Sequence, residues 1–322
     1  MLEIAAAAAG LVAAGGGASA IKAYLDGRRI ETASHPPRGR FVEIDGLPLH
    51  VCEAGPRDAP PVVLVHGIGG CVEDFIEGGL VDHLARDYRV FMMDRPGYGH
   101  SPRPAGRFGV REQVRVLRRL LARETIRAPL VVGHSYGALV ALALVLHPKS
   151  EVAGAVLMSG MYYPDERLAT SLLALPTAPL LGPALLWTLG APLARQAGPH
   201  LRARSFEPQT IPPALAARYP TAYAERPWQL RAQFEEAASL VADTAALAPL
   251  YRTCKVPLAI LHGDSDRSIE PDQAGRLAAA IPHARLRLLE GLGHMTHVFA
   301  HEAVREALAP AARERALPSQ VR

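Results

Sequence analysis

The chain has 322 residues, of which 49% are hydrophobic and 20% are charged, a composition that supports a large core and excludes an intrinsically disordered protein. Its formal net charge of +4 comes mostly from scattered arginines, so we do not expect a nucleic-acid partner. The cysteines Cys52, Cys71 and Cys254 show no C-x-x-C spacing, which indicates neither a disulfide framework nor a zinc site.

The N-terminal segment is apolar and lacks a clear assignment. Residues 4–21 are uncharged and rich in alanine and glycine, and Lys22, Arg28 and Arg29 follow them. The stretch is long enough to cross a bilayer, but its hydrophobicity is weak. Three interpretations stay open: weak membrane association with the body in the cytoplasm or on the cytoplasmic face of the membrane, a signal peptide ending at Ala18-Ser19-Ala20 with export, and a plain soluble helix.

Beyond a proline-rich linker at 35–39, the chain alternates strands and helices. Residues 41–44 and 49–53, joined by Asp45-Gly46, predict an antiparallel hairpin. The segments that follow are strands at 62–65, 90–93, 130–132, 154–158, 256–261 and 286–289, with helices near 72–86, 103–127 and 138–146 and a last one at 298–313. This alternation predicts an α/β fold whose mostly parallel sheet is covered by helices on both faces.

The helix expected within 103–127 carries the densest basic run. Val114 and Leu117 belong to its apolar stripe, whereas Arg115 and Arg119 fall on the opposite side. We interpret the arginines as a solvated helix face and not as a phosphate or membrane patch.

Between residues 161 and 253 the alternation stops, and short helical patterns replace it. A segment of this length between two strands is not expected to be an unstructured loop. We predict a helical lid at 161–253, inserted into a core formed by 36–160 and 254–322, with 1–35 as a separate N-terminal segment and linker. Its aromatic residues are expected to gate an apolar site; they are Tyr162, Tyr163, Trp187, Phe206 and Trp228.

The most informative motif is Gly133-His134-Ser135-Tyr136-Gly137, a G-x-S-x-G sequence between a strand and a helix. In this context the serine occupies a sharp, strained turn, and the two glycines remove side chains that would collide with the crossing backbone. The turn exposes Ser135 Oγ and directs the N-terminus of the next helix toward an oxyanion formed beside it.

Two further polar positions follow later strands. Asp264 and Asp266 come after the strand at 256–261, and His294 follows a glycine after the strand at 286–289. The order Ser, Asp, His, with each residue at a strand end, is that of α/β-hydrolase triads.

With the loops His66-Gly67-Ile68-Gly69-Gly70 and 94–101, these motifs make the chain resemble α/β-hydrolase-fold serine hydrolases over residues 41–316, in particular lid-bearing esterases and lipases. Serine stands at Ser135 where similar dehalogenases and epoxide hydrolases hold aspartate, which disfavours those two chemistries. The resemblance implies that Ser135 is the nucleophile, that His294 is the general base, and that Asp266 orients the imidazole.

Alternatives to these roles are weaker. Asp264 is the second choice for the acid, and Asp165 is a third. His297 and His301 fall where the last helix should have begun, so we expect them to be solvated or to cap that helix.

The oxyanion hole is expected to combine the N–H of Tyr136 with that of Ile68, and Gly69 is the second choice for the latter. His66 is interpreted as a structural anchor beneath the loop. Asp94 and Ser101 are interpreted as turn-forming residues.

The sequence thus predicts a serine hydrolase that needs no cofactor or metal and cleaves a carboxylic ester with an apolar acyl or alcohol part. Thioesterase, amidase, C–C bond hydrolase and perhydrolase activities use the same triad and remain alternatives. A non-catalytic binding protein with a hydrolase fold is the alternative of another class. A small apolar ester is the expected substrate, and nothing in the sequence indicates an oligomeric state.

Overall fold

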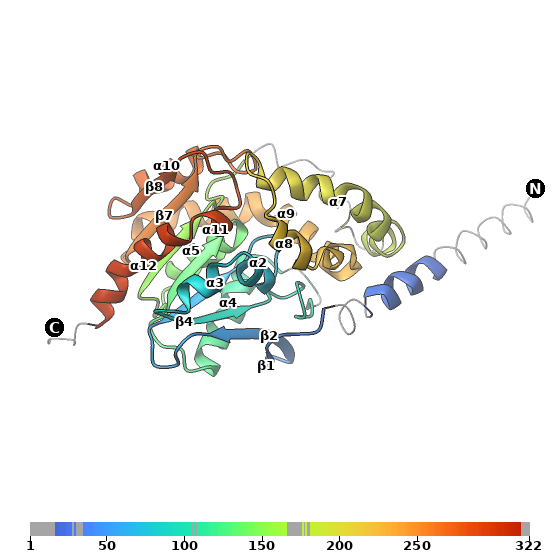
Figure 1. Cartoon of the computed structure of the whole chain (residues 1–322), viewed down its shortest axis with the longest axis horizontal. Coiled ribbons are helices and arrows are strands. Elements are labelled where there is room, and N and C mark those ends of the chain that lie inside the picture. The colour runs from blue at the N-terminus through green and yellow to red at the C-terminus, as the bar shows by residue number, and fades with distance from the viewer. Residues whose placement is uncertain are drawn as a thin grey trace, which may run out of the picture.

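The computed structural model describes residues 17–27, 29, 35–104, 106, 108–165, 176, 178 and 181–316. They contain one eight-stranded sheet in the order β1-β2-β4-β3-β5-β6-β7-β8 (Figure 1). The strands are β1 (Arg40–Ile44), β2 (Leu47–Ala54), β3 (Pro61–Val65), β4 (Arg89–Met93), β5 (Leu130–His134), β6 (Gly154–Met158), β7 (Leu258–Gly263) and β8 (Arg285–Leu289). All neighbours from β4 to β8 are parallel, which confirms the predicted fold class.

The predicted hairpin is confirmed and forms one edge of the sheet. β1 and β2 are antiparallel, with Ile44 opposite Leu47. Asp45 and Gly46 between them have φ values of 55° and 79°, the left-handed conformation that two-residue hairpin turns require. β2 then pairs antiparallel with β4 and joins the hairpin to the parallel strands.

Helices cover both faces of the sheet, and successive strand residues point to opposite faces. Val63 and Val65 of β3 belong to the core under α4 (Val110–Arg123), α5 (Tyr136–Val145) and α10 (Asp272–Ala280). Val62 and Leu64 belong to the opposite core, under α2 (Val72–Glu77), α3 (Leu80–Leu84) and α12 (His301–Ala316). In α4, Val114 and Leu117 are buried and Arg115 and Arg119 are exposed, as expected.

The prediction of one helix over 72–86 is wrong. The segment forms α2 and α3, and Gly79 between them has a φ of 83°. A left-handed residue cannot continue a right-handed helix, so the chain turns at this glycine. The last predicted helix is likewise divided, into α11 (Thr296–Phe299) and α12.

The segment between β6 and β7, which we call the insert (residues 161–253), is helical in its described parts, as predicted. It contains α6 (Leu181–Leu185), η4 (Leu186–Gly190), α7 (Ala191–Phe206), α8 (Pro213–Arg218), η5 (Thr221–Glu225), α9 (Pro227–Leu247) and η6 (Ala248–Thr253). Helices α7, α8 and α9 lie together on one side of the molecule (Figure 1).

The insert's aromatic residues make separate ring contacts, and their gating of an apolar site stays a prediction. Trp187 and Trp228 lie with ring centroids 6.1 Å apart, Tyr163 contacts Tyr251 in η6, and Phe206 packs on Phe299 of α11.

Residues 17–27 form a helix that contacts the insert. Ser19 Oγ donates to the Thr188 carbonyl oxygen at 3.1 Å, and the Trp228 ring lies against Gly27. Residues 4–16 of the predicted apolar stretch lie outside the described residues. Within the described residues, the structure contains no helix with both the length and the apolarity needed to cross a membrane.

Candidate active site

Ser135 lies in the predicted strained turn between β5 and α5. Its φ and ψ are 55° and −122°, a conformation that side-chain-bearing residues rarely adopt. A Cβ on Gly133 would lie 2.2 Å from the Gly137 carbonyl oxygen, and one on Gly137 would lie 2.1 Å from the Val65 carbonyl oxygen. Glycine is therefore required at both positions, which confirms the predicted reason for the motif.

The structure brings Asp266 and His294 together. Asp266 Oδ2 lies 2.8 Å from His294 Nδ1, while Oδ1 accepts the N–H groups of Ser268 at 2.8 Å and Ile269 at 3.0 Å. Burial raises the pKa of Asp266, but hydrogen bonds from His262 and His294 outweigh it and hold the pKa well below its usual range. The carboxylate therefore stays ionised and fixes the orientation of His294.

The second-choice acid, Asp264, is engaged elsewhere. It is exposed, and its Oδ1 accepts hydrogen bonds from the Gly291 N–H at 2.8 Å and from Ser265 Oγ at 2.9 Å. The Nδ1 atom of His294 is already bonded to Asp266, which leaves Asp264 and Asp165 as weaker candidates.

The expectation that His297 is solvated or caps a helix is wrong. Its side chain is fully buried, and its ring lies 4.1 Å from the His134 ring and 5.5 Å from the Phe75 ring. The short helix α11 already begins at Thr296, which turns His297 into the core. Burial lowers the pKa of His297 well below its usual value, so the ring is neutral. His301 is half-buried at the first position of α12.

His134 connects the serine turn to His294. Its Nε2 lies 2.9 Å from the His294 carbonyl oxygen and therefore donates to it, and the two rings are 5.0 Å apart. Burial lowers the pKa of His134 to about 3. This neutral residue, adjacent to Ser135, holds the backbone that carries His294.

The loop at 66–70 passes directly beside the serine. A Cβ on Gly67 would lie 2.9 Å from Ser135 Cβ and 3.4 Å from Ser135 Oγ. His66 lies beneath the loop as expected: Nδ1 donates to the Gly67 carbonyl oxygen at 2.9 Å, and Nε2 accepts the Arg95 N–H at 2.9 Å. Burial lowers the pKa of His66 to about 3, so His66 is a neutral anchor.

The expected oxyanion donors are the N–H groups of Ile68 and Tyr136. Among the described residues, neither the Ile68 N–H nor the Tyr136 N–H donates a hydrogen bond to a carbonyl. Tyr136 begins α5, where unpaired N–H groups and the helix dipole favour negative charge. Gly69, the second choice, has a φ of 77° and lies near Gln233 of α9.

Asp94 does more than form a turn. It is buried, and it bonds His50 Nδ1 at 2.7 Å and the N–H groups of Val72 and His100, each at 2.9 Å. Ser101 Oγ accepts the His50 N–H at 2.9 Å. These contacts tie the loop after β4 to β2 and α2.

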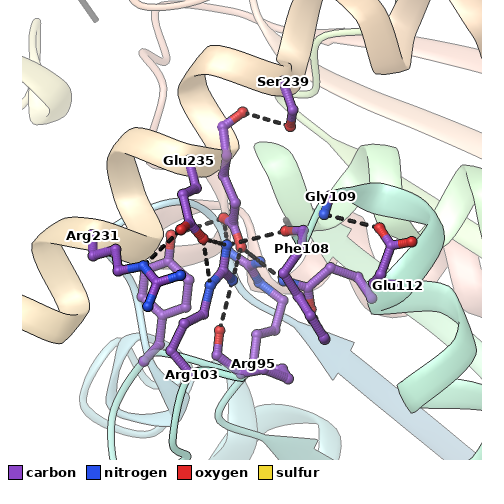
Figure 2. A network of polar contacts seen from close by, with 12 residues as sticks. Arg95, Arg103, Phe108, Gly109, Glu112, Arg231, Glu235 and Ser239 are labelled. Atoms are coloured by element: carbon purple, nitrogen blue, oxygen red, sulfur yellow. Dashed lines mark hydrogen bonds and ion pairs between the residues drawn. The ribbon is translucent and has the colours of Figure 1, made fainter. Parts of the chain in front are cut away.

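Three polar residues near the site were missed at the sequence level. His262 lies 3.3 Å from Asp266 Oδ2 through Nε2, and Arg95 pairs with Glu236 of α9 in a buried network (Figure 2). Arg95 stands in the 94–101 motif, and Glu236 shares a helix side with Ala232 and Leu240, which are buried. The charge of Glu236 among apolar residues on one side of a predicted helix was the sequence signal that could have identified it.

The described residues contain no group of three or more His, Cys, Asp or Glu side chains arranged to hold a metal ion. The thiols of Cys52, Cys71 and Cys254 are free and buried. A cavity of about 330 Å³ lies at the amino ends of β6 and β7, lined by Gly154, Leu258 and their neighbours, and thus at the opposite strand ends from Ser135.

Comparison with known proteins agrees with this architecture. The magnesium-chelatase 30 kDa subunit of Rhodobacter capsulatus is 30% identical over 270 residues, covering 79% of this chain and 87% of the relative. The enol-lactonase from Burkholderia xenovorans LB400 superposes with a TM-score of 0.65 at 22% identity, covering 85% of this chain and 99% of that structure. A membrane phospholipase A described as a bacterial virulence factor superposes with a TM-score of 0.66 at 20% identity, covering 96% of each chain.

The family model of the alpha/beta hydrolase fold matches residues 60–300. This range holds β3 to β8, the serine turn, the insert, and both Asp266 and His294. The chain therefore belongs to the α/β-hydrolase fold family.

Proposed function

We propose that this protein hydrolyses carboxylic esters through an acyl-enzyme on Ser135. The observation that carries the proposal is the 2.8 Å contact between Asp266 and His294 Nδ1. It leaves His294 Nε2 as the basic nitrogen, and His134, which donates to the His294 carbonyl oxygen, directly precedes the serine held in a strained turn. A nucleophile, a base and an orienting carboxylate are the parts that acyl transfer requires.

The proposed reaction has two stages. Ser135 Oγ attacks the ester carbonyl carbon while His294 Nε2 takes the hydroxyl proton, and the N–H groups of Ile68 and Tyr136 stabilise the oxyanion. The intermediate collapses to the acyl-enzyme, and the alcohol leaves with the proton from His294. Water then attacks the acyl carbon, His294 takes its proton, and the acid is released as Ser135 regains its hydrogen.

An apolar acyl or alcohol part is proposed for the substrate. Phe206 and Leu215 of the insert form a hydrophobic cluster with Val298, and Met295, next to His294, packs against it. This buried apolar cluster joins the insert to the residue that follows His294, which supports a lid role for the insert and a preference for apolar esters. With p-nitrophenyl esters, we expect kcat/KM to rise from acetate to octanoate. A flat profile would contradict the preference.

The proposal is tested first by Ser135→Ala. The substitution removes the nucleophile and leaves the backbone donors, so ester hydrolysis and fluorophosphonate labelling should both disappear. Residual activity within about tenfold of the wild type would refute the assignment of the nucleophile. The circular dichroism spectrum should be unchanged and serves as the folding control.

A non-catalytic binding protein is the second candidate. It is favoured by the likeness to the magnesium-chelatase 30 kDa subunit of Rhodobacter capsulatus, a protein that is not named as a hydrolase. Fluorophosphonate labelling of the wild-type protein separates the two, because labelling requires an activated serine. A protein that neither reacts with the probe nor cleaves any ester would favour the second candidate.

We also propose weak association with a membrane surface through the N-terminal segment. Ile21 and Leu25 of the helix at 17–27 are 63% and 59% exposed, and this helix continues the apolar stretch 4–16. Leu189 and Leu193 of the insert are also exposed, and Ser19 contacts Thr188 beside them. Exposed apolar side chains on two adjoining elements favour a lipid partner.

Vesicle sedimentation tests this association. The full chain should sediment partly with vesicles of anionic phospholipid, and the double variant Ile21→Ser, Leu25→Ser should not. Leu288→Ser, which changes an exposed leucine of β8, should behave as the wild type. If the double variant sediments as the wild type does, the helix is not the site of association.

A further inference from the structure

Arg95 and Glu236 form an ion pair that joins the insert to the core of the protein. Arg95 lies in the loop after β4, and Glu236 lies on α9, 141 residues later in the chain. Both side chains are fully buried. Nη1 lies 2.7 Å from Oε1, and Nη2 lies 3.0 Å from Oε2, so the two groups meet in the paired, two-bond geometry of arginine and carboxylate.

Several donors surround the carboxylate of Glu236. Besides Arg95, it accepts hydrogen bonds from Tyr98 Oη at 2.8 Å and Gln113 Nε2 at 2.7 Å, with Arg103 Nη1 at 3.4 Å. A buried ion pair of this kind adds little stability compared with well-packed apolar residues. The pair therefore matters more for the groups that it holds in place than for stability.

The remaining donors of Arg95 hold the loop that passes beside Ser135. Nε donates to the His66 carbonyl oxygen at 2.8 Å, and Nη2 donates to the Gly67 carbonyl oxygen at 2.9 Å. In a planar trans peptide, the carbonyl oxygen and the next N–H point in opposite directions. Holding the Gly67 carbonyl toward Arg95 therefore points the Ile68 N–H away from Arg95.

Arg95 also contacts the second expected donor residue. Its guanidinium carbon lies 4.9 Å from the centroid of the Tyr136 ring and 4.6 Å from that of Tyr98. Tyr136 carries the N–H that begins α5. One cation thus touches both elements from which the oxyanion hole would be built.

A second residue of α9 lies near the same loop. Gln233, nearly one helical turn before Glu236, has its Oε1 3.8 Å from the position of a Cβ on Gly69. The helix therefore lies on the loop at Gly69 and holds it through Arg95 at the carbonyls of His66 and Gly67.

We propose that Arg95 and Glu236 are positioning residues. They hold the N–H groups of Ile68 and Tyr136 where both can bind the substrate oxyanion, so that the insert completes the oxyanion hole. This inference rests on the proposed ester hydrolysis. It assigns to the insert a role in transition-state stabilisation in addition to any role in substrate selection. Neither residue is expected to touch the substrate.

The test compares Glu236→Gln with Glu235→Gln in the full chain. The amide that replaces the Glu236 carboxylate offers a single acceptor oxygen, so Arg95 loses its paired contact and the loop carbonyls are held less firmly. Glu235 pairs instead with Arg103 and Arg231. We expect Glu236→Gln to lower kcat about 30-fold, because removing one oxyanion donor outright costs about 10²–10³. KM should change less than about threefold, and Glu235→Gln should leave both constants within about twofold.

A trifluoromethyl ketone forms a tetrahedral oxyanion with the serine. Its inhibition constant would not change if Arg95 and Glu236 had a purely structural role. Its inhibition constant should rise in proportion to the fall in kcat, because both depend on the same N–H groups. An increase in KM with kcat unchanged would instead show that the pair only anchors the insert, and the inference would be wrong.

Arg95→Lys provides a second test if Glu236→Gln folds poorly. Lysine keeps the charge but cannot hold Glu236, the His66 carbonyl and the Gly67 carbonyl in the planar arrangement of a guanidinium. The same selective loss of kcat is expected. Wild-type kcat in a folded Arg95→Lys variant would overturn the inference while Ser135→Ala remained inactive, so this failure is distinct from failure of the proposed hydrolysis.

Discussion

Asp266→Asn is the substitution whose effect follows most directly from the geometry of the site. The N–H groups of Ser268 and Ile269 hold one carboxylate oxygen, and they would hold the amide carbonyl oxygen in its place. The amide NH₂ would then face His294 Nδ1, 2.8 Å from the present Oδ2. Two donors cannot share that contact, so Nδ1 must become the acceptor and the imidazole proton must move to Nε2.

With its proton on Nε2, His294 can no longer accept the Ser135 proton. We expect kcat for p-nitrophenyl acetate to fall about 10⁴-fold, which corresponds to about 5 kcal/mol of transition-state stabilisation. His262 Nε2 adds to the conflict, since it donates to the Ile269 carbonyl oxygen at 3.0 Å and also lies 3.3 Å from Oδ2.

The control is Asp264→Asn, which changes an exposed carboxylate two residues away and should alter kcat less than about threefold. Both variants should retain the wild-type circular dichroism spectrum. An Asp266→Asn variant within about tenfold of wild type, or an Asp264→Asn variant more damaged than Asp266→Asn, would refute the assignment of the acid.

Two predictions concern stability. Gly137→Ala should prevent stable folding or lower the melting temperature strongly, because the added Cβ would lie 2.1 Å from the Val65 carbonyl oxygen. Gly275→Ala in α10 should instead stabilise the fold by about 0.5–1 kcal/mol, because no atom of the described residues lies within 4 Å of the added Cβ.

Local patterns in the sequence were sufficient for the strands and the serine turn. The hairpin at Asp45-Gly46 and the turn at Ser135 depend on residues within a few positions of each other, and on backbone conformations that glycine permits. Asp266 and His294 could likewise be selected from the sequence, because each follows the end of a predicted strand. Parallel strands bring their carboxyl ends to one edge, so the chain order alone predicts their meeting there.

Other features depended on contacts between distant parts of the chain. The burial of His297 arises where α11 packs against Phe75 of α2, and no local pattern specifies which neighbour a side chain meets. The contact between Arg95 and Glu236 joins residues 141 positions apart. A buried charge is tolerated only where the fold supplies its partner. Only the tertiary structure, by bringing α9 onto the loop beside Ser135, decided that these two charges belong to the site.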